Sequence, residues 1–135
     1  MIPTWHFIIS TILFLILYPF LGIYSFLVYL GGWLIDLDHM LYYAIKFRSL
    51  DYFEANRYFR KLRTAKKRAI NILHTAEVLL LMIIASFFNI YLLIITLGMA
   101  SHIIMDLIYQ LTAKKTNIRY WTLTSWIIDI AKGKR

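Results

Sequence analysis

Two long uncharged stretches constrain this chain more than any other feature of its sequence. Residues 5–35 carry no Asp, Glu, Lys or Arg, and residues 78–101 carry none either. Runs of more than about 18 apolar residues are typical of membrane-spanning helices. Hydrophobic residues make up 61% of the 135-residue chain, against roughly 45–50% in a soluble domain. The sequence therefore predicts an integral membrane protein of one domain, with a soluble protein built on a buried helical hairpin as the alternative.

Turn signals divide the apolar stretches into four predicted helices. Pro19 and Gly22 interrupt the first stretch, and Asn89 marks a turn in the second. We predict an all-α fold, an integral membrane bundle of four helices in two hairpins, as a single membrane-embedded domain. Its parts are helices at about 4–18, 20–35, 70–88 and 90–112, a basic amphipathic cytoplasmic insert at 40–69, and an interfacial C-terminal helix within a tail at 113–135.

The distribution of basic residues predicts the topology. All 15 Lys and Arg lie within residues 46–68 and 114–135, and the other two connections carry none. By the positive-inside rule, the insert and both termini face the cytoplasm, which predicts a multi-pass protein of the inner cell membrane. The net charge of +8 is then a consequence of topology, and no nucleic-acid partner is expected.

The basic insert is predicted to contact membrane lipids. The stretch Ser49-Leu50-Asp51 could cap a helix that runs through Lys67, and most of the basic residues of the insert lie along that helix. One interpretation is an amphipathic helix on anionic headgroups. The other is that one or two of these residues hold a substrate phosphate. The oligomeric state is left open by the sequence.

The predicted hairpins return acidic and imidazole side chains to one level. His6 lies 13 residues before Pro19 and Asp36 lies 17 after it, while His102 and Asp106 lie 13 and 17 after Asn89. Antiparallel legs of equal length bring such residues to the same depth. Eight side chains are therefore expected at the cytoplasmic end of the bundle: His6, Asp36, Asp38, His39, His74, Glu77, His102 and Asp106.

These residue types predict a metal site. His74 and Glu77 are three residues apart, and His102 and Asp106 are four apart, so each pair would share a helix face. Helical bundles build metal sites from such inward-facing pairs. Oxygen and nitrogen ligands suit Zn, with Mn, Fe or Mg as alternatives, and the number of groups allows one or two ions. The chain has no cysteine, which excludes thiolate ligands, disulfides and a cysteine nucleophile.

For several of these residues, a purely structural role is an alternative to metal binding. His6 could be a satisfied polar residue at a membrane interface, and Asp38 could face solvent. Glu77 could favour a helix N-terminus, or it could hold a metal ligand in place.

The motifs that carry these residues occur in a distinctive order. His6 comes first, followed by the block Leu34-Ile35-Asp36-Leu37-Asp38-His39. Leu73-His74-Thr75 comes next, and His102-Ile103-Ile104-Met105-Asp106 comes last. This order resembles the YdjM-like family of membrane-bound metal-dependent hydrolases, which has an early His, then Leu-Pro-Asp-x-Asp-His, His-Arg-Gly-x-x-His-Ser and His-x-x-x-Asp.

The resemblance covers about residues 4–112 and includes two departures. Ile35 replaces the proline of the first block, and Ala69 stands where the second block has its first His, with Arg68 one place early. The last motif is also similar to that of zinc-dependent phospholipases C and single-strand nucleases. These resemblances imply metal-dependent hydrolysis, and the second implies a phosphoester substrate.

The leading hypothesis is a membrane-bound hydrolase that uses a divalent metal to cleave a phosphoester on a lipid or polyprenyl substrate. Asp38, Glu77 and Arg68 are the candidate catalytic residues: Glu77 would be a ligand or a general base, and Arg68 would stabilise charge on the phosphoryl oxygens. Two alternatives remain, a metal-ion or proton carrier and a membrane interaction protein that a metal ion staples together.

Overall fold

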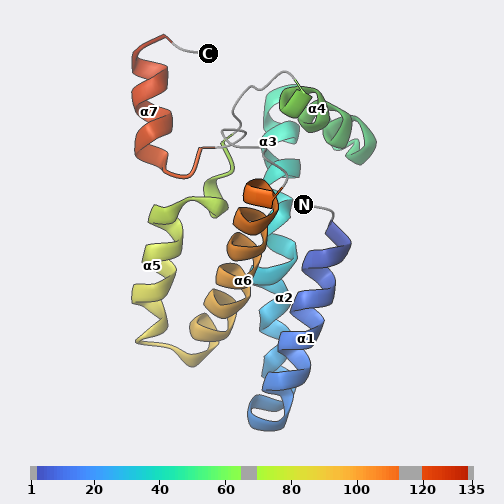
Figure 1. Ribbon diagram of the computed structural model, residues 1–135, viewed down its shortest axis with the longest axis vertical. Helices are drawn as coiled ribbons and strands as arrows, with labels where there is room; N and C mark the ends of the chain where they lie inside the picture. Colours follow the sequence, from blue (N-terminus) through green and yellow to red (C-terminus); the bar gives the residue numbers. More distant parts are fainter. Residues whose placement is uncertain (1–2, 65–69, 113–119, 134–135) are drawn as a thin grey trace. The chain divides into compact units, whose positions relative to one another are not determined.

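The computed structural model describes residues 3–64, 70–112 and 120–133, which fold into helices joined by short loops, with no β-strand among them. The all-α prediction is confirmed for this part of the chain, while the four-helix membrane bundle stays a prediction. In chain order the helices, with η marking a 3₁₀-helix, are α1 (Pro3–Leu21), η1 (Gly22–Leu27), α2 (Val28–Gly32), η2 (Leu34–Asp36), α3 (Leu37–Phe47), α4 (Tyr52–Thr64), η3 (Ile72–His74), α5 (Ala76–Ser86), α6 (Ile90–Thr112) and α7 (Leu123–Ala131) (Figure 1).

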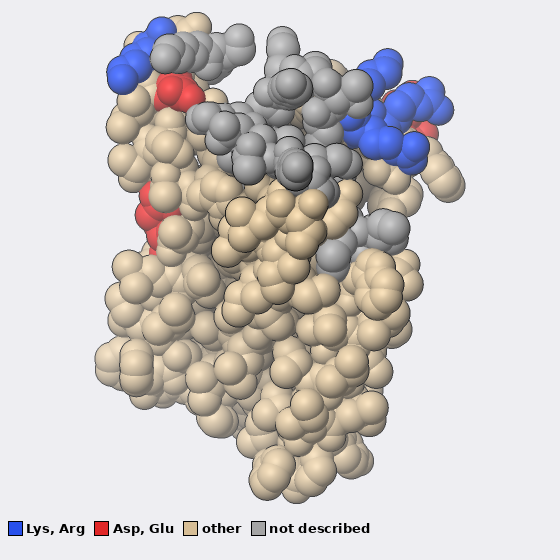
Figure 2. Space-filling model, viewed as in Figure 1, with Lys and Arg blue, Asp and Glu red and all other residues tan. Residues whose placement is uncertain are grey.

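The chain divides into two compact units. Unit 1 comprises Met1–Ile35 and Leu79–Lys114, and unit 2 comprises Asp36–Val78 and Lys115–Arg135. In the described part of unit 1, Asp106 is the only residue that is an Asp, Glu, Lys or Arg. Figure 2 shows the resulting uncharged surface over α1 and α6. Charge is therefore concentrated in unit 2.

Unit 1 begins with a helical hairpin that turns at Gly22 rather than at the predicted Pro19. Pro19 lies in the last turn of α1, and the chain reverses where Gly22 adopts a φ of +54°, which glycine allows at little steric cost. The returning leg is not one α-helix over 20–35, because the 3₁₀-helix η1 precedes the short helix α2. The Tyr29 hydroxyl donates to Thr11 Oγ1 at 2.9 Å and so joins the two legs.

Glycines bring α2 and α6 into backbone contact. A Cβ added at Gly98 of α6 would meet the carbonyl oxygen of Val28 and would lie 2.8 Å from the amide nitrogen of Gly32. A Cβ added at Gly31 of α2 would meet the carbonyl oxygen of Ile95. Small residues let helices approach this closely, as is common inside membranes. The contact between α2 and α6 therefore requires glycine on both helices.

The predicted helix over 70–88 is shorter in the structure. It corresponds to α5, which begins at Ala76, and η3 precedes it. Thr75 lies between them in an extended conformation (φ −86°, ψ 150°), so helical geometry is interrupted there. The turn to α6 follows at Asn89, whose side-chain oxygen accepts a hydrogen bond from the Tyr91 amide at 2.8 Å.

Two stretches of the described chain are long and apolar enough to cross a membrane. They are Thr4–Phe47, which contains α1 and its hairpin turn, and Ile90–Thr112, which is α6. The 19 residues of α1 measure about 28 Å and the 23 residues of α6 about 34 Å, close to a hydrocarbon core of about 30 Å. With 11 residues, α5 measures about 16 Å and is too short to cross alone.

Unit 2 contains a second helical hairpin, formed by α3 and α4. Its core consists of Tyr43 from α3 with Ala55 and Phe59 from α4, and all three side chains are buried. Asp51 caps α4 as predicted, because its Oδ1 accepts hydrogen bonds from the amides of Phe53 and Glu54 at 2.8 and 3.0 Å. The predicted end of this helix at Lys67 lies outside the described residues.

The close approach of α2 and α6 makes Gly98→Ala strongly destabilising. The new methyl group has no room beside the Val28 carbonyl, so we expect a loss of about 1–3 kcal/mol in the free energy of unfolding, as for other overpacked sites. Thermal unfolding in detergent micelles, followed by circular dichroism, measures the loss. The neighbouring exposed substitution Leu97→Met serves as the control. Equal stability of Gly98→Ala and wild type would show that the helices do not pack this closely.

Candidate metal sites

Four polar side chains of unit 2 gather where two short 3₁₀-helices end. We name Asp36, Asp38, His39 and His74 the unit-2 cluster. Asp36 is the last residue of η2, Asp38 and His39 lie in the first turn of α3, and His74 ends η3. Carboxylates in the first turn of a helix are favoured by the helix dipole. Asp36 makes no side-chain cap to α3, so its carboxylate is not used for capping.

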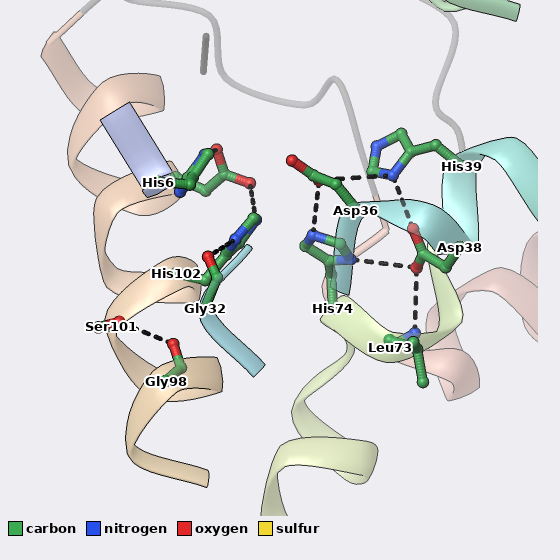
Figure 3. A network of polar contacts seen from close by, with 11 residues as sticks. His6, Gly32, Asp36, Asp38, His39, Leu73, His74, Gly98, Ser101 and His102 are labelled. Atoms are coloured by element: carbon green, nitrogen blue, oxygen red, sulfur yellow. Dashed lines mark hydrogen bonds and ion pairs between the residues drawn. The ribbon is translucent and has the colours of Figure 1, made fainter. Parts of the chain in front are cut away.

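The Asp38 carboxylate forms hydrogen bonds with both imidazoles of the unit-2 cluster. Its Oδ1 lies 2.6 Å from His39 Nδ1, and its Oδ2 lies 3.1 Å from His74 Nδ1 (Figure 3). The amide of Leu73 also donates to Oδ2, at 3.2 Å. Since an ionised carboxylate only accepts hydrogen bonds, both Nδ1 atoms are the donors. Asp38 therefore fixes the tautomer and the orientation of both rings, as carboxylates do behind metal-bound histidines.

The second nitrogen of His74 faces a carboxylate. With Nδ1 as the donor, the Nε2 of a neutral imidazole carries a lone pair. This Nε2 lies 3.3 Å from Asp36 Oδ1, and the His74 side chain is buried. Two acceptor atoms at this distance are stable beside each other when a proton or a cation lies between them. Ligands about 2.1 Å from a tetrahedral zinc ion are themselves about 3.4 Å apart, so the separation fits a shared ion.

Three polar side chains of unit 1 form a second group, the unit-1 cluster of His6, His102 and Asp106. His6 lies on α1, and the other two lie one turn apart on α6. The rings of His6 and His102 stack with centroids 3.7 Å apart. Asp106 bridges them, with Oδ1 3.4 Å from His6 Nε2 and Oδ2 3.6 Å from His102 Nε2. All three side chains are buried.

A backbone carbonyl sets the tautomer of His102. Its Nδ1 lies 2.9 Å from the carbonyl oxygen of Gly32, which only accepts, so Nδ1 is the donor (Figure 3). The remaining nitrogen, Nε2, then presents its lone pair to Asp106. His6 Nδ1 is buried with no hydrogen-bond partner among the described residues. The unit-1 cluster thus repeats the facing acceptors of the unit-2 cluster.

The donor types of the clusters fit a divalent ion. Asp36, His39 and His74 each offer a ligand atom, and these atoms lie within 4.8 Å of one another. Carboxylate oxygen and imidazole nitrogen are the ligands of Zn and of the harder first-row metals. The Asp36 and His39 side chains are 32% and 23% exposed, so the unit-2 cluster is in part accessible to solvent. The buried unit-1 cluster lacks this access.

Glu77 belongs to neither cluster. It lies in the first turn of α5, and its carboxylate accepts hydrogen bonds from the Leu123 amide at 3.0 Å and from the Thr124 amide and hydroxyl at 3.2 and 3.1 Å. These contacts cap the first turn of α7. The Leu123 amide, together with Thr124, lowers the pKa of the Glu77 carboxyl below its ordinary value of 4.5. Its contacts among the described residues are those of a helix-capping residue.

Of the eight predicted side chains, four belong to the unit-2 cluster, three belong to the unit-1 cluster, and Glu77 contacts α7. The prediction that all of them share one pocket concerns both units together and stays a prediction. Arg68 lies outside the described residues.

Sequence reasoning missed the backbone groups that orient the clusters. The Gly32 carbonyl and the Leu73 amide each bond a cluster residue, and both lie next to or inside the motifs already singled out. The pair Gly31-Gly32 was the available signal, because adjacent glycines in an apolar helix indicate close backbone approach.

Comparisons with models of protein families, with curated proteins and with solved structures find no match to this chain. The resemblance to the YdjM-like family therefore stays a prediction. The interpretation of both clusters depends on their geometry.

Asp38 is expected to position the ligands of the unit-2 cluster rather than to bind the ion itself. In a His102→Ala background, which disables the unit-1 cluster, Asp38→Asn should weaken zinc binding by about 10–100-fold without changing its stoichiometry. His74→Ala should remove this site. Zinc titration of the metal-stripped protein against a fluorescent chelator measures both, with Asp129→Asn as the control. Complete loss of zinc binding in Asp38→Asn would instead show that Asp38 is a metal ligand. Unchanged zinc affinity would show that Asp38 neither binds the ion nor positions its ligands.

The cap that Glu77 forms is expected to depend on pH. A carboxyl whose pKa is lowered on folding stabilises the fold above its ordinary value, and this contribution is lost as the pH falls through the folded pKa. At pH 7, the Leu123 and Thr124 amides should therefore exchange hydrogen faster in Glu77→Gln than in wild type, and the difference should shrink below about pH 4.5. Glu54→Gln is the control. A difference that persists at low pH would show that charge is not responsible.

Proposed function

We propose that this protein is a membrane-embedded, metal-dependent hydrolase that cleaves a phosphoester on a lipid or polyprenyl substrate. The observation that supports it is the unit-2 cluster: Asp36, His39 and His74 converge, the side chains of Asp36 and His39 are partly exposed, and Asp38 accepts hydrogen bonds from both imidazoles. A catalytic metal site keeps a position open, whereas a structural site is closed. The partial exposure of Asp36 and His39 favours the catalytic kind.

Each residue of the unit-2 cluster has a separate part in this proposal. Asp36, His39 and His74 would hold the ion, most naturally zinc, with Mn, Fe or Mg as alternatives. Such an ion supplies Lewis acidity and lowers the pKa of water that it binds. Asp38 accepts hydrogen bonds from the Nδ1 atoms of both imidazoles, which leaves the Nε2 of His74 facing Asp36. Arg68, as predicted from the sequence, would stabilise charge on the phosphoryl oxygens.

The position of the motif along the chain supports the substrate class that we propose. Asp36 directly follows the uncharged residues 5–35, so the first carboxylate comes where an apolar stretch ends. A phosphoester whose apolar tail stays in the bilayer would present its headgroup at that depth. We place the protein in the inner cell membrane as a multi-pass protein with its termini and metal site on the cytoplasmic side, on the support of the basic residues.

The unit-1 cluster supports a second role for metal. Its three side chains are buried, and they join α1 to α6. An ion held by His6, His102 and Asp106 would act as a staple between two helices, because a closed shell suits a structural ion. This interpretation is compatible with hydrolysis at the unit-2 cluster, and on its own it describes a metal-stapled interaction protein.

Metal content and turnover test the proposal together. The purified protein is expected to contain a divalent metal by elemental analysis and to release phosphate from at least one member of a panel of lipid and polyprenyl phosphates in mixed micelles. Chelation should abolish turnover, and added zinc should restore it. His74→Ala should lower turnover by about 100-fold or more, because the imidazole is a direct ligand of the proposed ion.

Two controls sharpen this experiment. Asp129→Asn removes a carboxylate of α7 outside both clusters and should leave turnover unchanged. His102→Ala should lower thermal stability in the presence of metal, since it removes part of the proposed staple. Metal without turnover on any substrate would favour the staple alone, and a protein that never binds metal would remove the proposal.

A further inference from the structure

The turn between α3 and α4 exposes large apolar side chains. Leu50 is 82% exposed and Phe53 is 78% exposed, and Tyr52 between them is exposed as well. We name these three residues the hairpin tip. The inner faces of the two helices already bury Tyr43, Ala55 and Phe59 against each other, so the tip is not part of that core. Exposed apolar clusters of this kind mark contacts with a membrane or with another protein.

The backbone of the hairpin tip is fixed rather than loose. Arg48 ends α3 in the left-handed conformation, with a φ of 53°, which is uncommon for a residue with a Cβ. Ser49 Oγ accepts a hydrogen bond from the Asp51 amide at 3.2 Å, and Asp51 in turn caps α4. These bonds present Leu50 at the outer end of the turn. The exposure of the tip is therefore built into the fold.

Basic side chains continue from the hairpin tip along α4. Arg57, Arg60 and Lys61 are exposed on this helix, and Figure 2 shows Lys and Arg gathered over it. The two acidic side chains nearby are both engaged within the hairpin. Asp51 caps α4, and Glu54 accepts a hydrogen bond from the Tyr43 hydroxyl at 3.2 Å. The outer surface therefore combines apolar and positively charged groups.

We propose that the α3–α4 hairpin docks on an anionic lipid surface, with Leu50 and Phe53 inserted among the headgroups and the basic side chains of α4 on lipid phosphates. Apolar insertion combined with Lys and Arg is how interfacial helices bind membranes. A purely apolar tip would fit a protein partner as well, and the adjoining positive charge is what favours the lipid surface. The proposal rests on the membrane anchoring of the proposed function, but neither on metal nor on catalysis.

A single fluorescent label tests the docking in the full chain. Because the protein has no cysteine, Leu50→Cys provides one attachment site for an environment-sensitive dye. The labelled protein is reconstituted into vesicles of phosphatidylcholine alone and into vesicles that also contain phosphatidylglycerol. In the anionic vesicles we expect blue-shifted emission, quenching by nitroxide lipids and at least about twofold weaker quenching by iodide. High salt should reverse these changes, since it screens the attraction.

Matched charge variants separate the hairpin from the rest of the chain. Arg57→Gln with Lys61→Gln should shift the docking equilibrium by roughly 30-fold, at about fivefold for each charge, and should restore iodide quenching. Lys132→Gln with Lys134→Gln removes two charges from the C-terminal tail and should change little. Iodide shielding that is independent of lipid charge, or absent in both vesicles, would overturn the proposal; the first result would indicate a protein contact instead.

Flotation of the vesicles tests the anchor separately. Protein that floats with both kinds of vesicle is anchored, and the label then reports on the hairpin alone. Protein that floats only with anionic vesicles would contradict the proposed membrane-embedded function while supporting hairpin docking. Protein that floats with neither would overturn both.

Discussion

In each cluster, a carboxylate oxygen faces one nitrogen of an imidazole ring, and the other nitrogen of the same ring donates a hydrogen bond. Asp38 accepts a hydrogen bond from His74 Nδ1, and the Gly32 carbonyl of α2 accepts one from His102 Nδ1. The lone pairs left on the two Nε2 atoms face Asp36 and Asp106 at 3.3 and 3.6 Å. Facing lone pairs repel unless a proton or a cation lies between them, and burial makes this requirement stricter. Both clusters are therefore arranged to hold positive charge.

In unit 1 this arrangement depends on how closely α2 approaches α6. The Gly32 carbonyl reaches His102 only because the two backbones touch, and Gly98, one turn before His102, is where they touch. A side chain at Gly98 would separate the helices and withdraw the carbonyl from the imidazole. The same small residues thus determine helix packing and the tautomer of a candidate ligand.

Properties that depend on local sequence were predictable, and those that depend on a single backbone angle were not. Apolar length predicted helices, and a helix cap was expected within Ser49-Leu50-Asp51, where Asp51 forms it. Pro19 and Gly22 both signal an interruption, but only Gly22 adopts the left-handed angle that reverses the chain. His74 and Glu77 would share a face on one helix, yet the extended Thr75 separates them, so Glu77 reaches α7 instead.

The different exposure of the clusters separates what each can do. His6, His102 and Asp106 lie buried in a unit whose described part has no other Asp, Glu, Lys or Arg, and burial of such groups is costly unless a proton, a cation or hydrogen bonds compensate it. A compensating ion there would join α1 to α6. In the unit-2 cluster, Asp38 accepts a hydrogen bond from His74, while the Asp36 side chain is partly exposed. A catalytic metal site needs ligands held in place and an accessible position, so our proposal assigns the chemistry to unit 2 and a stabilising ion to unit 1.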